Sequence, residues 1–277
     1  MPELPEVELV AQSLNRLVAK RKIVRAELLR ERLAAPTSAA TFAVFLQNVT
    51  IESVGRRGKH ILFYFDANKA LVAHLRMTGR FLLLPAEREI PKHTHAVFYL
   101  ENSSKLVFQD QRHFGMMKIA DRDQVFELEE LKRLAPEPLS EDFSFKYFTR
   151  VLQNSGRTIK EVLLDQTKIC GLGNIYAAEA MFLARVNPHL AASKISRKRA
   201  QNLFEAIRFV LSESIALGST MNVDPENIDA SYNGGVYENH WRVYDQENKN
   251  CGECQNSIKR IVQNQRSTFF CPVCQRR

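Results

Sequence analysis

The chain has 277 residues, 45% of them apolar, which is enough for two ordinary globular domains or one large one. The net charge of +8 favours a polyanionic partner such as nucleic acid, although ribosomal and membrane-surface proteins share this charge balance. No apolar run approaches the roughly 20 residues that span a bilayer, and the N-terminus is acidic where a signal peptide is basic, so we expect no membrane association and a reducing, cytoplasmic compartment.

The chain begins Met1-Pro2-Glu3-Leu4-Pro5-Glu6, and apolar residues then recur with the spacing of one helix face. Pro5 suits the first turn of such a helix, and Glu3 and Glu6 suit the positive end of its dipole. If Met1 is removed, Pro2 carries a secondary amine that can attack an aldehyde-like carbon and form an iminium ion. For these six residues alone, a proline-capped helix start without chemistry remains the alternative.

Residues 23 to 119 have a strand-like pattern, in which short β-rich runs are separated by polar, glycine or proline breaks. These runs are residues 49–54, 61–65, 71–75, 81–84, 96–100 and 106–108. So many short strands predict a two-layer β-sandwich packed with the N-terminal helix. The turn Gly55-Arg56-Arg57-Gly58-Lys59 joins two of the strands and is expected to lift a cluster of cations off the sheet.

Helical spacing replaces the strand pattern after the proline-rich segment 134–140. Ser196 is the predicted N-cap of a long helix, and residues 177–185 predict a shorter one. Gly171-Leu172-Gly173-Asn174 precedes the shorter helix and can present N–H groups to a phosphate, with an ordinary interhelical turn as the alternative. We therefore expect an N-terminal domain at 1–133, a linker at 134–143, a helical domain at 144–240 whose residues 218–240 form a loop, and a C-terminal hairpin at 241–277.

Four of the five cysteines form two Cys-X2-Cys pairs, Cys251 with Cys254 and Cys271 with Cys274, separated by 16 residues. This is the spacing of a closed, four-thiolate structural zinc site, for which disulfides or free thiols are the alternative. Residues 258–262 and 267–270 predict the strands of a hairpin with Arg266 at its tip. Such a short hairpin cannot bury a core, so the metal should hold it folded.

Several motifs in this order resemble the bacterial formamidopyrimidine-DNA glycosylases, also called 8-oxoguanine DNA glycosylases, along the whole chain. The motifs are Pro2-Glu3-Leu4-Pro5-Glu6-Val7-Glu8, Arg57-Gly58-Lys59, His74-Leu75-Arg76-Met77-Thr78-Gly79, Asp110-Gln111-Arg112-His113-Phe114-Gly115, Pro136-Glu137-Pro138-Leu139, Leu164-Asp165-Gln166, Gly171-Leu172-Gly173-Asn174-Ile175-Tyr176 and the four cysteines with Arg266. The resemblance implies an α+β fold: an N-terminal helix plus a two-layer β-sandwich, then an all-helical helix–two-turn–helix domain with a C-terminal zinc-ribbon hairpin.

The resemblance also implies a bifunctional glycosylase and AP lyase of base excision repair, acting on oxidised purines in duplex DNA. Pro2 would attack C1′ of the flipped nucleotide, Glu3 would act as general acid and base, and Glu6 would support the site. β-Elimination and then δ-elimination would follow. Lys59 and Arg266 match the residues assigned to these two eliminations, and pure phosphate binding is the alternative for both.

The expected DNA contacts come from the same resemblance. His93 and Asn174 match positions that bind the DNA backbone. Met77, Arg112 and Phe114 match the residues that fill the gap left by the flipped nucleotide. One structural Zn²⁺, damaged double-stranded DNA as partner, a monomeric state and a bacterial, nucleoid-associated location complete the expectation.

Two positions depart from the family pattern. The loop at 218–240, which covers the flipped base in this family, has Asn222 where a basic residue is usual, so lesion preference stays open. Gly156 stands before Arg157, where the family is usually basic. The alternatives are an endonuclease VIII-like glycosylase for oxidised pyrimidines, which usually begins Pro-Glu-Gly-Pro-Glu, and a non-enzymatic, zinc-containing DNA-binding protein.

Overall fold

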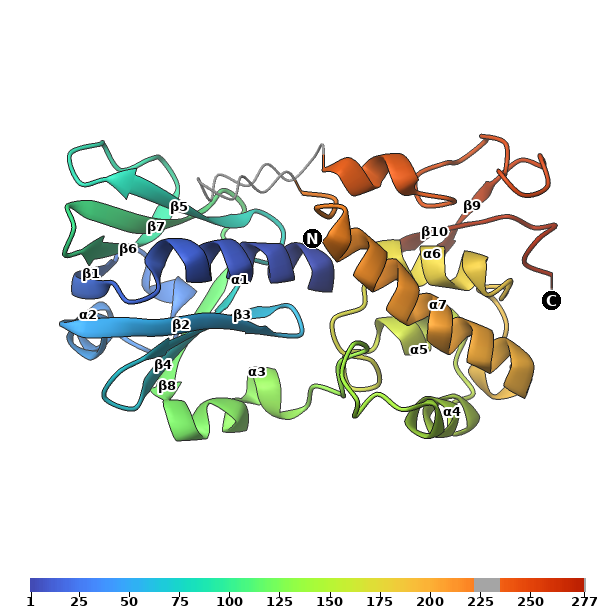
Figure 1. Cartoon of the computed structure of the whole chain (residues 1–277), viewed down its shortest axis with the longest axis horizontal. Coiled ribbons are helices and arrows are strands. Elements are labelled where there is room, and N and C mark those ends of the chain that lie inside the picture. Colours follow the sequence, from blue (N-terminus) through green and yellow to red (C-terminus); the bar gives the residue numbers. More distant parts are fainter. Residues whose placement is uncertain (222–234, 277) are drawn as a thin grey trace. The chain divides into compact units, whose positions relative to one another are not determined.

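The computed structural model describes residues 1–221 and 235–276, which form two compact units (Figure 1). The first unit comprises Met1–Lys132 together with the described residues of Gly218–Gly235. The second comprises Arg133–Leu217 and Val236–Arg277. The contacts thus group the start of the expected capping loop with the N-terminal unit. Asn222, which stands where the family usually has a basic residue, lies outside the described residues.

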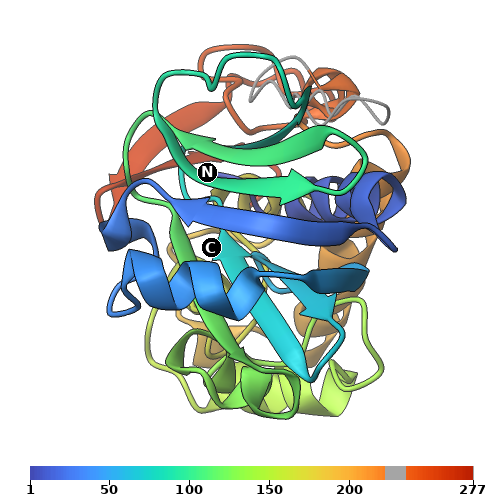
Figure 2. The same ribbon diagram turned by 90° about the vertical axis from the view of Figure 1, so that its left-hand side faces the viewer.

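The first unit contains one antiparallel sheet of eight strands that is folded into two layers (Figures 1 and 2). The strands are β1 (Lys22–Leu28), β2 (Val49–Arg57), β3 (His60–Phe65), β4 (Lys69–His74), β5 (Gly79–Pro85), β6 (Thr94–Leu100), β7 (Ser104–Asp110) and β8 (Met116–Asp121). Their order is β5-β7-β6-β1-β2-β3-β4-β8. The layers meet where β1 pairs with β2 over only two residue pairs, Lys22 with Thr50 and Ile23 with Val49. The expected two-layer sandwich is confirmed.

The core of this unit lies between the two layers and under helix α1 (Leu4–Val18). Val7, Val10 and Leu14 are buried on the apolar face of the helix that the spacing indicated. Phe63 from one layer and Phe81 from the other meet at a ring-centroid distance of 5.5 Å. Buried apolar residues of both layers therefore build one continuous core.

Two strands and two short helices of this unit were not among the predicted elements: β1, β8, α2 (Ala39–Leu46) and α3 (Glu129–Lys132). Strand β8 pairs only with β4, and its side chains are mostly half-buried. An edge strand of this kind has a weak alternation pattern. Helix α2 has a Ser38 N-cap, which accepts from the Thr41 N–H at 3.1 Å, but its side chains are apolar around most of the helix, so no clear period marks it.

The second unit contains helices α4 (Phe145–Gln153), α5 (Ile159–Leu164), α6 (Asn174–Leu183) and α7 (Arg197–Ala216). Ser196 caps α7 as predicted, because its hydroxyl accepts from the Arg199 N–H at 3.4 Å. Helix α6 begins at Asn174, three residues before the predicted start, since Gly173 is its extended N-cap. Among the described residues no helix is long and apolar enough to cross a membrane.

The C-terminal hairpin consists of β9 (Lys259–Gln263) and β10 (Arg266–Phe270). Asn264 and Gln265 both have left-handed backbone angles, with φ of 48° and 61°, as a two-residue hairpin turn requires. The sequence predicted Arg266 at the tip, and the turn has it there as the closing residue: Arg266 pairs with Gln263 and is also the first residue of β10.

The hairpin also shares a core with the helices, contrary to the expectation that it forms a separate unit. Ile258 and Phe269 of the hairpin are buried with Ala178 and Phe182 of α6. This contact buries apolar surface that the short hairpin could not bury alone. The metal and the helix therefore hold the hairpin together.

Candidate active site

The N-terminus forms a compact arrangement in which Pro2 is buried and two carboxylates cap helix α1. Glu3 is the N-cap, and its side chain accepts from the Glu6 N–H while the Glu6 carboxylate accepts from the Glu3 N–H at 2.8 Å. The side chains lie in a site that water hardly reaches, since Glu3 is 4% and Glu6 1% exposed. This capping box fixes the backbone immediately after Pro2. The geometry holds a carboxylate next in sequence to the proposed amine.

Glu6 also anchors the start of the predicted capping loop. Its carboxylate accepts from the Thr220 hydroxyl at 2.9 Å and from the Thr220 N–H at 3.4 Å. Met221 follows and is buried in the sandwich core. Gly235 N–H donates to the Thr220 carbonyl, and a Cβ on this glycine would come within 2.4 Å of the Ser219 carbonyl oxygen. Only glycine permits this close approach.

Lys59 lies in the two-residue turn between β2 and β3, where Gly58 has a φ of 59°. It is only 6% exposed, so the expectation that this turn lifts its lysine off the sheet is wrong. The short turn directs the chain straight back into β3. An amine that is buried beside a reacting phosphate interacts with it more strongly than an amine in water.

A buried pair of histidines lies directly after Lys59. His60 on β3 and His74 on β4 are opposite each other, with ring centroids 4.6 Å apart in an edge-to-face arrangement. Burial lowers the pKa of His60 to about 4 and that of His74 to about 2, so both rings are neutral at pH 7. His74 Nδ1 accepts from the Arg76 N–H at 2.9 Å, which fixes the start of the loop that carries Met77.

The three expected gap-filling residues lie on two loops that one buried carboxylate ties together. Asp110 is fully buried and accepts from the Thr78 hydroxyl, from the Arg112 N–H at 3.2 Å and from the Gly115 N–H at 2.7 Å. Thr78 belongs to the Met77 loop, whereas Arg112 and Gly115 flank Phe114. Asp110 therefore sets the spacing between the two loops.

The side chains on these loops are exposed, as gap filling requires. Met77 is 38% and Phe114 51% exposed, although both are large apolar residues. The Arg112 guanidinium lies 5.1 Å from the centroid of the Phe114 ring, a cation–π distance. Neither Met77 nor Phe114 is therefore a core residue.

In the second unit, two side chains hold the backbone next to Arg266. The Asn174 amide donates to the Ser267 carbonyl at 3.0 Å, and Lys160 Nζ donates to the same oxygen at 2.8 Å. Lys160 also donates to the Thr268 hydroxyl. Burial lowers the pKa of Lys160 to about 8, and the charge of Arg266 contributes. Arg266 itself is exposed, so its guanidinium is available to a partner.

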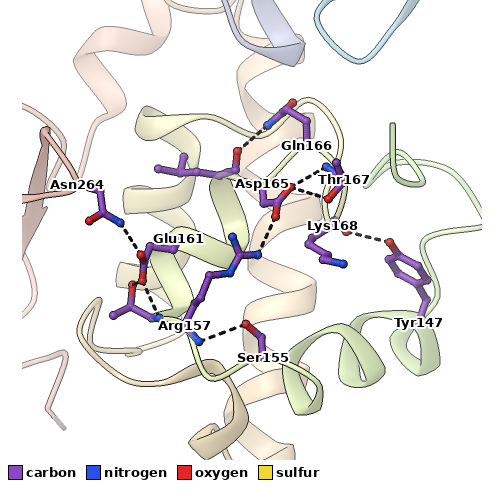
Figure 3. A network of polar contacts seen from close by, with 11 residues as sticks. Tyr147, Ser155, Arg157, Glu161, Asp165, Gln166, Thr167, Lys168 and Asn264 are labelled. Carbon is purple, nitrogen blue, oxygen red and sulfur yellow. Dashed lines mark hydrogen bonds and ion pairs between the residues drawn. The ribbon is translucent and has the colours of Figure 1, made fainter. Parts of the chain in front are cut away.

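A polar network joins helix α5 to the turn of the hairpin (Figure 3). The Asn264 amide donates to Glu161, which also accepts from the Thr158 hydroxyl and N–H. These bonds lower the pKa of Glu161, with the Thr158 hydroxyl as the largest cause. Arg157 donates to Asp165 at 2.7 Å. The network secures the turn that directs Arg266 into β10.

The four cysteines of the C-terminal motif converge, with all four sulfur atoms within 4.8 Å of one another. Two of the separations are 3.9 Å, between Cys251 and Cys274, and 3.4 Å, between Cys254 and Cys271. A tetrahedral zinc with Zn–S bonds of about 2.3 Å requires sulfur atoms about 3.8 Å apart. The residues present fit one structural zinc. Cys170, the fifth cysteine, is fully buried and lies outside this group.

A further buried carboxylate positions the segment that leads to the zinc site. Glu179 on α6 accepts from the N–H groups of Arg242, Val243 and Tyr244, each at 2.9 Å. Burial raises its pKa, and the three N–H groups oppose this shift. Arg242 also pairs with Glu213 at 2.9 Å. This set of bonds connects α6, α7 and the approach to Cys251.

Four of these residues, Asp110, Lys160, Glu179 and Thr220, have positioning roles that the sequence did not predict. Asp110 belongs to one of the family motifs, but nothing local indicates that its carboxylate serves a distant loop. Lys160 and Glu179 could have been suspected, because each is a charged residue within an apolar helical run. Thr220 carries no such signal.

Comparison with known proteins places these features in a family context. Residues 1–117 match the formamidopyrimidine-DNA glycosylase N-terminal domain, residues 134–224 its H2TH domain, and residues 249–277 the zinc finger found in FPG and IleRS. The formamidopyrimidine-DNA glycosylase of Listeria monocytogenes is 37% identical over 277 residues, which is 100% of both chains. That of Chloroflexus aurantiacus is 40% identical and covers 99% of this chain and 98% of its own.

Solved structures with the same fold belong to the same family as these sequence matches. The Lactococcus lactis Fpg in complex with DNA containing an abasic site superposes with a TM-score of 0.92 at 32% identity, covering 99% of this chain and 100% of the other. A second complex of the same Lactococcus lactis protein contains DNA with an oxidised pyrimidine and superposes with a TM-score of 0.91 at 32% identity, covering 100% of each chain.

Proposed function

Because this chain belongs to the formamidopyrimidine-DNA glycosylase family, we propose that it excises oxidised purines from duplex DNA and cleaves the strand at the resulting abasic site. The observation that carries the proposal is the buried N-terminal arrangement, in which Glu3 and Glu6 fix the backbone after Pro2 at the positive end of α1. A protein that only binds DNA has no need of this arrangement. Endonuclease VIII-like specificity is the alternative that the substrate panel below tests.

The reaction begins after Met1 is removed and the damaged nucleotide has left the helical stack. The lone pair of the Pro2 nitrogen forms a bond to C1′, and the bond from C1′ to the base breaks with its electron pair, which a proton from solvent or a site residue neutralises. The nitrogen then loses its N–H proton to solvent, and its lone pair forms the C1′=N bond as the bond from C1′ to O4′ breaks. Glu3 assists this ring opening by proton transfer to O4′ and later accepts protons as a general base. The product of base excision is an iminium ion that joins Pro2 to C1′.

The iminium makes the C2′ proton acidic, because the electrons left by that proton are delocalised toward the nitrogen. Loss of this proton expels the 3′ phosphate, and a second elimination expels the 5′ phosphate. We assign Lys59 to the target phosphate and Arg266 to a flanking phosphate. Lys59 also suits proton donation in the first elimination, whereas a guanidinium is a poor acid and suits charge stabilisation.

The remaining site residues serve DNA binding. Met77 and Phe114 fill the space of the flipped nucleotide, as intercalating side chains do elsewhere. Arg112 has only donors, so it suits the O2 and N3 acceptors of an opposite cytosine. His93 and Asn174 contact the DNA backbone. We propose that the protein acts as a monomer in the bacterial cytoplasm at the nucleoid, with zinc as a structural ion.

Borohydride trapping on a duplex with one abasic site tests the nucleophile. We expect a covalent adduct that peptide mapping assigns to Pro2, and a variant with one additional residue before Pro2 should lose trapping while it still binds the duplex. The matched control is Glu3→Gln, which should slow excision of 8-oxoguanine more than trapping at a preformed abasic site. An adduct on the peptide that contains Lys59 would overturn the assignment.

A panel of duplexes tests the substrate class. Each carries one lesion, either 8-oxoguanine, a formamidopyrimidine or an oxidised pyrimidine, opposite each of the four bases. The oxidised pyrimidine belongs in the panel because such DNA was crystallised with the Lactococcus lactis relative. Fastest excision of the pyrimidine would favour the endonuclease VIII-like alternative.

A further inference from the structure

An ion pair joins the helix at the N-terminus to the strand that leads into the Lys59 turn. Glu8 lies early in α1, and Arg56 lies near the end of β2, two residues before Gly58. The Arg56 Nε–H donates to the Glu8 carboxylate at 2.7 Å, and the Arg56 side chain is only 9% exposed. Since Pro2 directly precedes the start of α1, this bond links the two elements that carry the proposed nucleophile and the proposed proton donor.

The same guanidinium also holds the backbone of the turn. Arg56 Nη1 donates to the Gly58 carbonyl at 3.0 Å. This carbonyl belongs to the peptide group that joins Gly58 to Lys59, so the bond fixes the orientation of that peptide plane. Gly58 has a φ of 59°, and glycine adopts this and other backbone angles with little difference in energy. The conformation of Gly58 alone therefore does not fix the direction of Lys59.

Glu8 is itself held in place within helix α1. Its second carboxylate oxygen accepts from the Gln12 amide at 2.9 Å, one turn further along the helix. The helix is also attached to β2 where the Asn15 side chain accepts from the Val54 N–H at 2.8 Å. Glu8 thus gives the Arg56 guanidinium a fixed acceptor. A rigid fork of donors that bridges two acceptors is a property of arginine that lysine lacks.

The burial of Lys59 makes its placement important. Its side chain is only 6% exposed, so its amine has little room to reorient toward a phosphate. A displacement of about 1 Å at a reacting group can cost on the order of 100-fold in rate. An ion pair that served stability alone would end at Glu8, whereas the Arg56 guanidinium extends the contact to the Gly58 carbonyl.

We propose that Arg56, held by Glu8, is a positioning residue for Lys59 and that it acts on the first elimination rather than on formation of the iminium ion. The proposal rests on the proposed function, because it takes Lys59 as the residue that serves this elimination. The capping box that fixes the backbone after Pro2 is made within the first residues of the chain. Attack on C1′ should therefore proceed without Arg56, whereas loss of the 3′ phosphate should slow.

Borohydride trapping on a preformed abasic site separates these two steps. A label on the 3′ side of the site stays in the trapped adduct only while the 3′ phosphate is attached, whereas a label on the 5′ side also counts adducts that have lost it. In Arg56→Ala, single-turnover strand cleavage should slow about tenfold, and the ratio of 3′-labelled to 5′-labelled adduct should rise at least twofold. This ratio does not depend on the folded fraction of the protein, so a loss of stability alone leaves it unchanged.

Variants at both ends of the ion pair refine the test. Glu8→Ala should raise the label ratio as Arg56→Ala does, whereas Glu8→Gln should stay near the wild type because its amide oxygen still accepts from Arg56. Combining Glu8→Arg with Arg56→Glu restores an ion pair but provides no donor for the Gly58 carbonyl, so cleavage should stay slow. Arg122→Ala is the matched control, because it breaks an ion pair with Glu52 on the same strand.

A double-variant comparison tests whether Arg56 acts through Lys59. In a Lys59→Ala background, Arg56→Ala should slow cleavage no further, because no amine is left to position. A further tenfold loss there, an unchanged label ratio in Arg56→Ala, or full cleavage by the charge-exchanged variant would overturn the proposal. A wild-type protein that forms no trapped adduct would instead count against the proposed function.

Discussion

Replacing Asp110 with asparagine should uncouple the gap-filling loops from the sandwich. Three donors share the two carboxylate oxygens: the Thr78 hydroxyl, the Arg112 N–H and the Gly115 N–H. Asparagine offers one acceptor oxygen, so at least one N–H would face an NH2 group. A buried donor without an acceptor costs about 1–3 kcal/mol, and a hydrogen bond to a charged group contributes about 1.5–3 kcal/mol. We therefore expect the substitution to lower the free energy of unfolding by about 2–4 kcal/mol.

Part of this loss should appear as slower cleavage of duplex DNA, since the loops must be ordered to fill the gap. Each 1.4 kcal/mol corresponds to about a tenfold change in rate. Single-turnover cleavage of 8-oxoguanine opposite cytosine should therefore slow at least tenfold, while trapping at a single-stranded abasic site should change less than about threefold. Asp121→Asn, at an exposed position, is the matched control. Equal slowing on the duplex and the single strand would refute the reasoning.

Three further predictions follow from the site. Arg112→Ala should flatten the preference for cytosine over adenine opposite the lesion, which cleavage rates on the two duplexes measure; a full preference in this variant would contradict the role of Arg112. Cys251→Ser should lose zinc, measured by metal analysis, and DNA affinity with it, while the β-sandwich stays folded because it is a separate unit; full-strength binding without zinc would disprove this. The free energy of unfolding should be at its maximum above pH 6.5 and fall toward pH 4, because burial holds the pKa of His60 at about 4 and of His74 at about 2, below the value near 6.5 in the unfolded chain. Each imidazole contributes roughly 1.4 kcal/mol per pH unit at most, so the urea midpoint of His60→Phe should fall less steeply from pH 7.5 to pH 5 than that of the wild type.

The sequence predicted best those features that short-range patterns encode. The Cys-X2-Cys spacing indicates convergence of four sulfur atoms, because two such pairs are the usual ligand set of a structural zinc site. Ser196 indicates a helix start, since a hydroxyl at that position satisfies an otherwise unpaired N–H. The short β-rich runs that contain Phe63 and Phe81 predict strands, because such residues favour the extended backbone. In each case the residues that predict the feature also form it, and they lie close together in the chain.

The features that the sequence did not predict depend on distant partners. Glu6 accepts a hydrogen bond from Thr220, which lies 214 positions further along the chain, and no local pattern at either residue predicts this contact. Lys160 was overlooked because its acceptors, Ser267 and Thr268, lie on β10, 107 and 108 positions further along the chain. The backbone conformation of the hairpin turn is also not evident from the sequence, because the left-handed angles of Asn264 and Gln265 favour glycine and neither residue is one.

The discontinuity of the first unit has a consequence for protein synthesis. Thr220 and Met221 complete the surroundings of Glu6 and the core, but the ribosome makes them after the whole helical segment Arg133–Leu217. At roughly 5–20 residues per second, the N-terminal sandwich waits on the order of seconds for its last elements. A nascent or truncated chain that ends before these residues lacks both hydrogen bonds from Thr220 to Glu6 and the buried side chain of Met221. The surroundings of the Glu6 carboxylate are therefore complete only after the helical segment has been synthesised.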